Sequence, residues 1–226
     1  MSPAYPIRWS WADLLDPLIR LLDDGGVVGF PTESSYAIGA DPKSVQGVDA
    51  IFKAKRRAPD KPLPVVLGSL DQLVQLGGDP DQPMLRQIAR LWPAPLTVVV
   101  PINQPLPAAA MMDSLAIRIP AHRKLRNLLG RLGRPLASTS ANLSGDKPVS
   151  NPEMLKPILR NRPSLIIDDG ILPGGSPSTI VRIETDGVVV LRQGAYPADR
   201  LAEALSIPVF SAGAAEMSAD DSLETR

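Results

Sequence analysis

Apolar residues recur along the chain in two spacings, and these predict alternating helices and strands. Between residues 11 and 24, five leucines follow the i, i+3/i+4, i+7 spacing of an amphipathic helix, which Gly25 and Gly26 end. The apolar run 27–30 that follows is typical of a buried strand. The clearest strand is predicted at 96–100, where β-branched residues dominate.

The remaining pattern completes this alternation. Further helices are predicted at 44–57, 71–76, 82–91, 123–132 and 199–205. Further strands are predicted at 62–67, 115–119, 136–139, 165–168, 179–183 and 188–192. Such alternation indicates an α/β domain with a mixed sheet. Residues 211–226 are small, polar and acidic, so we expect them to fray.

Composition narrows the classes of function. The chain has 226 residues, which favours a single domain, and its 24 Lys and Arg balance 24 Asp and Glu. A neutral chain has no overall basic field for long nucleic acids, so a site for polyanions must be local. The absence of cysteine excludes disulfides and thiolate chemistry, and a single histidine, His122, disfavours a catalytic triad. We expect His122 to cap or pack a helix.

Neither a membrane-spanning run nor a secretory signal pattern is visible, so we expect a cytoplasmic protein without membrane contact. The G-x-x-x-x-G-K-[ST] and G-x-G-x-x-G patterns that mark common nucleotide sites are also absent.

Two polar loops and one basic run are candidates for chemistry. The turn 30–36 (FPTESSY) and the segment 138–145 (STSANLSG) each follow a predicted strand and present several hydroxyls, which suits either a polar ligand or local capping. The basic run comprises Lys53, Lys55, Arg56, Arg57 and Lys61. It could hold a di- or triphosphate, or it could be a solvated helix end.

Two arginines lie in predicted strands. Arg118 is in the strand 115–119, and Arg192 ends the strand 188–192. A charge inside an apolar strand is costly unless it is paired. Either an internal carboxylate or a ligand carboxylate should therefore meet Arg118.

Taken in order, these segments resemble the YrdC/TsaC family, the threonylcarbamoyl-AMP synthases. The matching segments are GGVVGFPTESSYAIGAD (25–41), IFKAKRRAPDKPL (51–63), LWPAPLTVVV (91–100), LAIRIPAH (115–122), STSANLSG (138–145), PSTIVRI (177–183) and VLRQG (190–194). The resemblance spans about residues 20–195, and STSANLSG is its most specific part.

The resemblance implies a fold, a reaction and its participants. The fold is a single-domain α/β, twisted mixed sheet flanked by helices, with a concave, positively charged cavity. The reaction joins ATP, L-threonine and bicarbonate into L-threonylcarbamoyl-AMP and releases pyrophosphate, with Mg²⁺ accompanying ATP. A tRNA-modifying threonylcarbamoyl transferase complex then uses the product, so a contact with tRNA is also expected.

The resemblance also implies roles for individual residues. The L-threonine-binding residues would be Thr32, Arg118, Ser138 and Ser178. The ATP-binding residues would be Lys55, Arg57, Lys61, Ser114, Ser140, Asn142 and Arg192. Arg57 and Lys61 would stabilise charge in the transition state, no residue is assigned as acid or base, and metal ligands are not assigned. On this reading the carboxylate that meets Arg118 belongs to the substrate.

The sequence departs from the family pattern in three places. Ala58 stands where proline is common, Ser35-Tyr36-Ala37 replace a threonine-valine-tyrosine run, and Arg182 replaces a usual Asp. The second departure is shared with the sister YciO proteins, so a YciO-like enzyme acting on threonylcarbamoylated RNA or nucleotide is one alternative. An RNA-binding module without this chemistry is another.

The resemblance also sets the expected domain limits. We predict a YrdC-like domain at 1–207 and a flexible acidic tail at 208–226, as in the short form of the family.

Overall fold

Eleven strands form one mixed sheet in the computed structural model, which describes residues 7–9, 11, 13–56, 61–142, 147–160 and 162–212. The strand order across the sheet is β1-β8-β2-β3-β7-β4-β6-β5-β9-β10-β11. The parallel pairs are β1/β8, β2/β8, β4/β6, β5/β9 and β10/β11, and the antiparallel pairs are β2/β3, β3/β7, β4/β7, β5/β6 and β9/β10. The predicted α/β class with a mixed sheet is confirmed.

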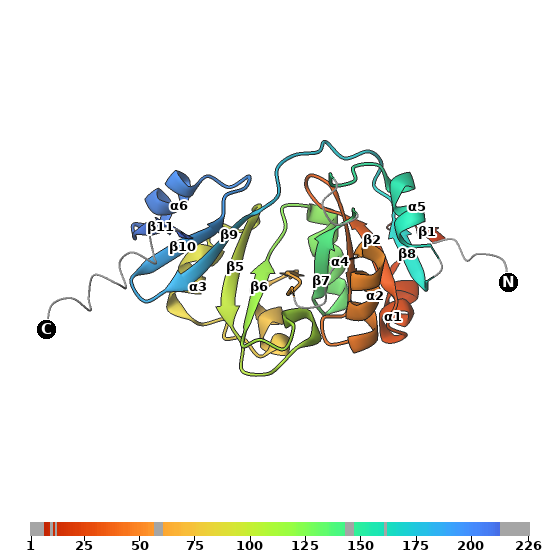
Figure 1. Cartoon of the computed structure of the whole chain (residues 1–226), viewed down its shortest axis with the longest axis horizontal. Coiled ribbons are helices and arrows are strands. Elements are labelled where there is room, and N and C mark those ends of the chain that lie inside the picture. The colour runs from red at the N-terminus through yellow and green to blue at the C-terminus, as the bar shows by residue number, and fades with distance from the viewer. Residues whose placement is uncertain are drawn as a thin grey trace, which may run out of the picture.

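One half of the sheet is built from the N-terminal part of the chain together with elements between residues 123 and 167 (Figure 1). Its strands are β1 (Ile7–Trp9), β8 (Ser164–Ile167), β2 (Val27–Pro31), β3 (Tyr36–Ala40) and β7 (Leu136–Ser140). Its helices are α1 (Leu15–Asp23), α2 (Val45–Lys55), α4 (Arg123–Leu132), the 3-10 turn η3 (Pro152–Met154) and α5 (Leu155–Ile158).

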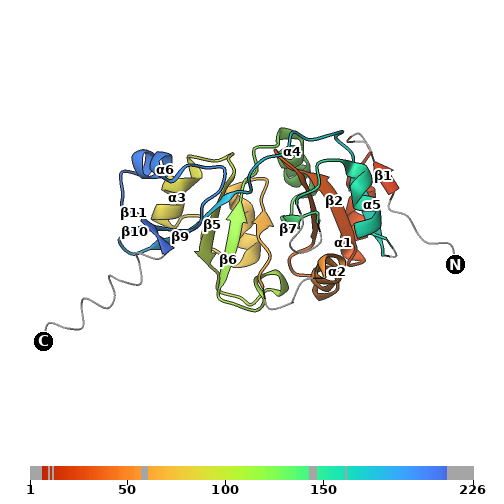
Figure 2. The same cartoon turned by 45° about the horizontal axis from the view of Figure 1, so that its top comes forward.

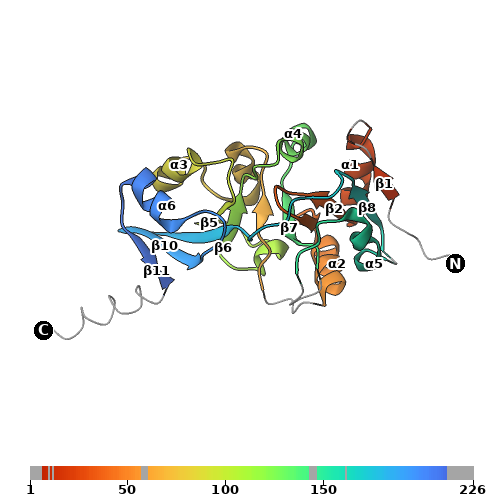
Figure 3. The ribbon, with the colours of Figure 1, turned by 90° about the horizontal axis from the view of Figure 1, so that it is seen from above.

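These helices cover both faces of this half-sheet, as Figure 3 shows from above. Leucines of α1 and α4 pack together with Phe30 and Leu136 on one face. Ile51 and Phe52 of α2 and Leu155 of α5 belong to a second cluster on the other face. Burial on both faces explains why β2 and β3 are buried at every position rather than at alternate ones.

The other half of the sheet carries the remaining elements (Figure 2). Its strands are β4 (Val65–Val66), β6 (Ser114–Arg118), β5 (Leu96–Pro101), β9 (Thr179–Glu184), β10 (Gly187–Arg192) and β11 (Val209–Ser211). Its helical segments are the 3-10 helices η1 (Leu70–Leu76) and η2 (Pro107–Ala109) and the α-helices α3 (Pro83–Ala89) and α6 (Ala198–Leu205).

Most predicted elements are confirmed, and the differences have local causes. The predicted strand 62–67 shortens to β4, because Pro62 and Pro64 cannot donate ladder hydrogen bonds. The predicted helix 71–76 is a 3-10 helix. Strand β3 is absent from the prediction, since its alanines and glycine carry little β propensity. A Cβ on Gly39 would lie 2.1 Å from the carbonyl oxygen of Ala137, so only glycine lets β3 approach β7 this closely.

Helix α2 positions the basic run. Ser44 caps its N-terminus: the Ser44 side chain accepts a hydrogen bond from the Gly47 amide. The helix ends at Lys55, and Arg56 then adopts a left-handed conformation with φ of 51°. The predicted phosphate contact Arg57 lies outside the described residues.

The connection from β8 to β9 runs across the molecule and joins the two halves of the sheet (Figure 1). The Gly174 amide donates to the carbonyl of Ser34 at 2.9 Å, and the Leu172 amide donates to the carbonyl of Ser150 at 2.9 Å. The first bond holds this crossing segment (168–178) against the turn between β2 and β3, and the second holds it against the chain just before η3.

The ordered chain continues beyond the predicted domain limit at residue 207. Strand β11 pairs in parallel with β10, aligning Val209 with Val188. Residues 213–226 of the predicted tail lie outside the described residues. None of the helices in the described ranges has the length and apolar character needed to cross a lipid bilayer.

Candidate functional site

A cavity of about 420 Å³ is lined by residues from both halves of the sheet. The β2–β3 turn, β3 and β7 contribute one wall. Strands β4, β5, β6, β9 and β10 contribute the other, and Gly175, Pro177 and Ser178 come from the crossing segment. The volume is within the usual range of small-molecule sites, about 300–1,000 Å³.

The first wall begins at the β2–β3 turn. Thr32 is buried, and both its amide and its hydroxyl donate to the carbonyl of Ser35, at 3.0 and 2.7 Å. This local bonding is the turn chemistry expected of threonine. It holds the backbone of Ser34 and Ser35 at the cavity surface.

Strand β7 contributes Ser138, Thr139 and Ser140 to the same wall. The Ser140 hydroxyl donates to the side-chain oxygen of Asn142 at 2.6 Å. Behind them, the ammonium of Lys55 donates to the Asn142 side-chain oxygen at 2.8 Å, to its backbone carbonyl at 2.9 Å and to the carbonyl of Ser140. Lys55, which is 3% exposed, therefore positions this loop from inside the protein.

The second wall carries the arginines. The strand register aligns Ile180 of β9 with Thr97 of β5 on one side and with Arg192 of β10 on the other, so Thr97 and Arg192 lie at the same level of the sheet. The Arg192 guanidinium donates to the carbonyl of Ser178 at 2.8 Å, and the Ser178 hydroxyl is 2.8 Å from the Thr97 hydroxyl. Arg118, on the neighbouring β6, lines the same cavity.

The charged residues of this lining are arginines. Its described residues include two arginines and no Asp or Glu. Burial lowers the pKa of Arg192 below its ordinary value, and the positive charge of Arg118 lowers it further. The two guanidiniums therefore repel each other, and an anion between them would relieve that repulsion.

Arg118 already has a carboxylate partner within the protein. Its Nη1 donates to Oε1 of Glu33 at 2.6 Å, and the two side chains are 13% and 20% exposed. The expectation that the partner of Arg118 belongs to the substrate alone is therefore wrong. Glu33 belongs to the β2–β3 turn, and no pattern in the sequence linked it to a residue 85 positions away.

The structure brings most of the predicted residues together. Those on the cavity wall are Thr32, Arg118, Ser138, Ser140, Ser178 and Arg192. Lys55 and Asn142 lie directly behind Ser140 rather than on the wall. Lys61 is exposed next to the cavity-lining Pro62, and Ser114 begins β6 two residues before the cavity-lining Ala116.

Sequence reasoning missed Glu33 and Thr97 as parts of this site. Thr97 is 2% exposed and is bonded to Ser178. A hydroxyl within the apolar strand 96–100 was a signal, since buried polar groups require partners. For Glu33 no comparable signal exists in the sequence.

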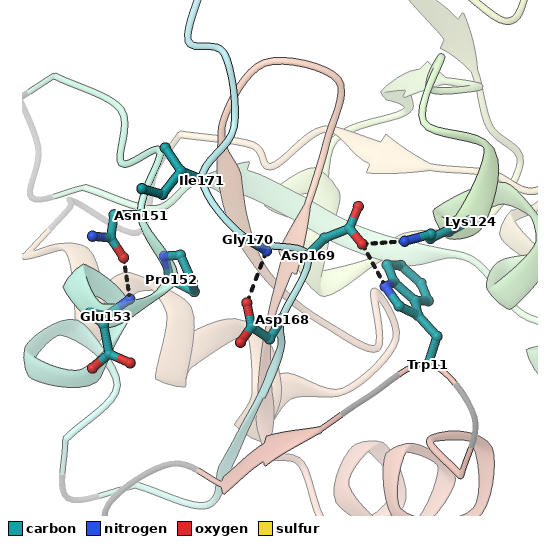
Figure 4. Close-up of a pocket in the computed structure, with 9 residues that line it drawn as sticks. All are labelled: Trp11, Lys124, Asn151, Pro152, Glu153, Asp168, Asp169, Gly170 and Ile171. Atoms are coloured by element: carbon teal, nitrogen blue, oxygen red, sulfur yellow. Dashed lines mark hydrogen bonds and ion pairs between the residues drawn. The ribbon is translucent and has the colours of Figure 1, made fainter.

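A second hollow, of about 540 Å³, lies open to solvent near the start of the crossing segment (Figure 4). Its side chains bond mainly to one another. The Asp169 carboxylate accepts from Trp11 Nε1 at 2.9 Å and from Lys124 at 2.5 Å. We therefore interpret it as a structural link.

His122 completes this link in the way the sequence predicted, as a helix cap. Its Nδ1 accepts from the Leu125 amide, the first-turn donor of α4, at 3.2 Å. In a neutral imidazole the proton is then on Nε2, which donates to the other oxygen of Asp169 at 3.0 Å. Its ring also stacks on Trp11.

Asp169→Asn should remove an acid-sensitive part of the stability. Burial raises the pKa of the Asp169 carboxyl, but hydrogen bonds from Lys124, Trp11 and His122 outweigh burial, and the pKa is lower than usual. A lowered pKa stabilises the fold above the unfolded pKa, about 3.9, and this contribution disappears as the pH falls through the folded value. We expect a loss of about 1–2 kcal/mol at pH 7 that shrinks towards pH 3.

Urea unfolding at several pH values measures this difference, with Glu203→Gln, an exposed position on α6, as control. A pH-independent difference between wild type and Asp169→Asn would contradict the assigned ionic link.

Comparison with known proteins identifies similar chains. The family model Sua5/YciO/YrdC, described as "Telomere recombination", matches residues 20–194. The threonylcarbamoyl-AMP synthase of Pyrococcus abyssi is 32% identical over 180 residues, 79% of this chain and 53% of that protein. The threonylcarbamoyl-AMP synthase of Xanthomonas axonopodis pv. citri is 36% identical over 164 residues, 71% of this chain and 85% of that protein. The chain thus spans about half the length of the former relative.

Solved structures agree on the fold. The crystal structure of P. abyssi Sua5 complexed with L-threonine has a TM-score of 0.78 at 27% identity, covering 91% of this chain and 62% of that one. The crystal structure of E. coli YciO has a TM-score of 0.69 at 23% identity, covering 85% of this chain and 96% of that one. The latter likeness concerns the fold alone.

Proposed function

Since the chain belongs to the Sua5/YciO/YrdC family, we propose that it makes L-threonylcarbamoyl-AMP from L-threonine, bicarbonate and ATP, with release of pyrophosphate. The observation that carries the proposal is the cavity itself. Two arginines and hydroxyl-bearing residues from four separate segments line one space of about 420 Å³ that spans both halves of the sheet. The similarity to enzymes of this name and to a threonine-bound Sua5 supports the same reading.

Within this proposal each substrate is held by residues from both walls of the cavity. Thr32, Ser138 and Ser178 would surround the amino acid, and Arg118 would bind its carboxylate. Ser140, Arg192 and Ser114 would contact the nucleotide, and Arg57 and Lys61 would stabilise charge on its phosphates. Lys55 and Asn142 would act from behind, by fixing the loop that presents Ser140.

The chemistry needs little from acids and bases. The amine of threonine, once deprotonated, attacks the carbon of bicarbonate, and water leaves as the carbamate forms. A carbamate oxygen then attacks the α-phosphorus of ATP, and pyrophosphate leaves. Positioning the reactants can contribute several kcal/mol, about 7–11 in favourable cases, and fixed cations stabilise the charge on the phosphates.

Mg²⁺ would arrive with ATP. The described cavity lining contains no carboxylate, and the described residues contain no cluster of three or more His, Cys, Asp or Glu that could hold a metal. Such a lining does not fit a protein-bound metal, whereas Mg²⁺ is commonly held by substrate phosphates and water. The roles proposed above for the side chains do not require a metal ion bound directly to the protein.

The proposal extends to location and partners. The product would pass to a tRNA-modifying threonylcarbamoyl transferase complex, and the protein would act in the cytoplasm, where ATP and tRNA are found. A contact with tRNA would occur during that transfer.

The direct test is threonine-dependent pyrophosphate release by the purified protein with ATP and bicarbonate. We expect release to require all three substrates and threonylcarbamoyl-AMP to appear in equal amount. Turnover of a threonylcarbamoylated nucleotide or RNA without this synthesis would indicate a YciO-like enzyme instead. Salt-dependent RNA binding without ATP consumption would indicate an RNA-binding module.

Arg57→Ala should lower kcat/KM for ATP about 100-fold or more, because removing a charged contact to phosphate costs about 3 kcal/mol. The melting temperature should stay within about 2 °C, since the proposed role of Arg57 is to bind the substrate and not to support the fold. Pyrophosphate release and thermal unfolding measure the two effects. Lys53→Ala, an exposed cation on α2, is the control. Wild-type turnover by Arg57→Ala would show that the basic run is only a solvated helix end.

A further inference from the structure

The ion pair between Glu33 and Arg118 places a carboxylate of the protein where a ligand carboxylate is expected. Arg118 Nη1 donates to Glu33 Oε1 at 2.6 Å, and Arg118 lines the cavity. Glu33 stands between two other cavity-lining residues, Thr32 and Ser34. A ligand that uses the whole Arg118 guanidinium must therefore compete with Glu33.

The pair is incompletely satisfied. The second oxygen of Glu33, Oε2, is buried, and in the described part of the structure no donor forms a hydrogen bond to it. A buried carboxylate oxygen without a donor has lost its hydration without compensation. An exchange of partners that brings a donor to Oε2 would supply the hydrogen bond that this oxygen lacks.

The turn keeps the Glu33 backbone in place during such an exchange. The backbone and side chain of Thr32 both donate to Ser35, and the carbonyl of Ser34 accepts from Gly174 of the crossing segment. Bonds on both sides of Glu33 leave mainly its side chain free to move. After leaving Arg118, the carboxylate would still be within side-chain reach of the cavity.

The charges of Arg118 and Glu33 determine which kind of ligand binds best. A ligand carboxylate on Arg118 repels the nearby carboxylate of Glu33, since like charges at short range are unfavourable. An ammonium on the adjacent carbon of the ligand removes this repulsion and supplies the donors that Glu33 lacks. A carboxylic acid with no substituent on that carbon supplies neither the positive charge nor the donors at that position.

We propose that Glu33 makes the amino-acid subsite specific for ligands that carry an ammonium next to the carboxylate. On binding, the ligand carboxylate takes Arg118 and the ligand ammonium takes Glu33. Glu33 is thus a specificity-determining residue, and this inference rests on the proposed function.

Calorimetric titration with two ligands tests the inference. L-threonine is compared with (R)-3-hydroxybutanoate, which has the same skeleton without the amino group. The proteins are the wild type, Glu33→Gln and the control Glu153→Gln, an exposed glutamate paired with Lys156. Glu33→Gln keeps the shape of the side chain and removes its charge.

We expect wild type and Glu153→Gln to prefer threonine by about 30-fold, the effect of one or two charge-assisted hydrogen bonds. Glu33→Gln should bind hydroxybutanoate about tenfold more tightly than wild type, because competition for Arg118 is weaker, while threonine affinity changes less than threefold. Tighter binding cannot result from a damaged fold. Glu33→Ala should likewise lose the preference.

The outcomes separate this inference from the proposed function. Wild-type preference in both Glu33 variants would overturn the inference alone and leave Glu33 as a structural link. Wild-type protein that binds neither compound would overturn both the amino-acid site and the inference.

Discussion

Replacing Arg118 by alanine should raise the KM for threonine about 100-fold while kcat changes less than threefold. A hydrogen bond to a charged group contributes about 1.5–3 kcal/mol, and Arg118 can form two to one carboxylate. Loss of binding that is equal in the ground and transition states raises KM and leaves kcat unchanged. Initial rates of pyrophosphate release at varied threonine, with ATP and bicarbonate saturating, measure both constants.

Two comparisons make this result specific. Arg182→Ala removes an exposed arginine of β9 that pairs with Glu184, and it should leave the KM unchanged. The KM for ATP should stay within threefold of wild type in Arg118→Ala. A larger rise in the KM for ATP than in that for threonine would move Arg118 to the nucleotide end of the cavity.

Lys55→Met should lower stability by about 3 kcal/mol and reduce kcat/KM for ATP about 100-fold. The buried ammonium donates to two oxygens of Asn142 and to the carbonyl of Ser140. An unsatisfied buried acceptor costs about 1–3 kcal/mol, so the loop must lose stability or rearrange. Either outcome moves Ser140 away from its place on the cavity wall.

Chemical unfolding and pyrophosphate release measure the two effects. The control is Lys53→Met, two residues earlier on α2, because Lys53 is exposed and its loss should change stability by less than about 0.5 kcal/mol. In thermal unfolding the Lys55→Met difference corresponds to about 6–12 °C. Stability and turnover unchanged by Lys55→Met would mean that the loop does not depend on this ammonium.

The predicted elements show which signals are local. Helix α4 and strand β5 were predicted because periodicity, capping and β-branched residues identify them within about ten positions. Strand β3 was not predicted, because its conformation is imposed by its neighbours. Strands β2 and β7 pair with it on either side, and Gly39 permits its close approach to β7.

The site residues also fall into two groups: those that local sequence signals identify and those that only the fold places. Sequence motifs identified Arg118, Arg192 and the hydroxyls of β7, since each follows from residue type and position in a strand. They misplaced Lys55, which was expected at the phosphates and is buried behind Ser140. Nothing local shows whether a lysine at a helix end turns outward or inward, because that depends on which backbone carbonyls the rest of the fold brings near.

By itself, the sequence determined the mixed α/β class, the absence of thiol chemistry and the set of cationic and hydroxyl side chains available for an anionic ligand. Only the tertiary structure decided which of them share a cavity and that Glu33 pairs with Arg118. The physical reason is the distance along the chain over which each interaction acts. Periodicity and capping act over a few residues, whereas this ion pair joins residues 85 positions apart and exists only once the sheet has formed.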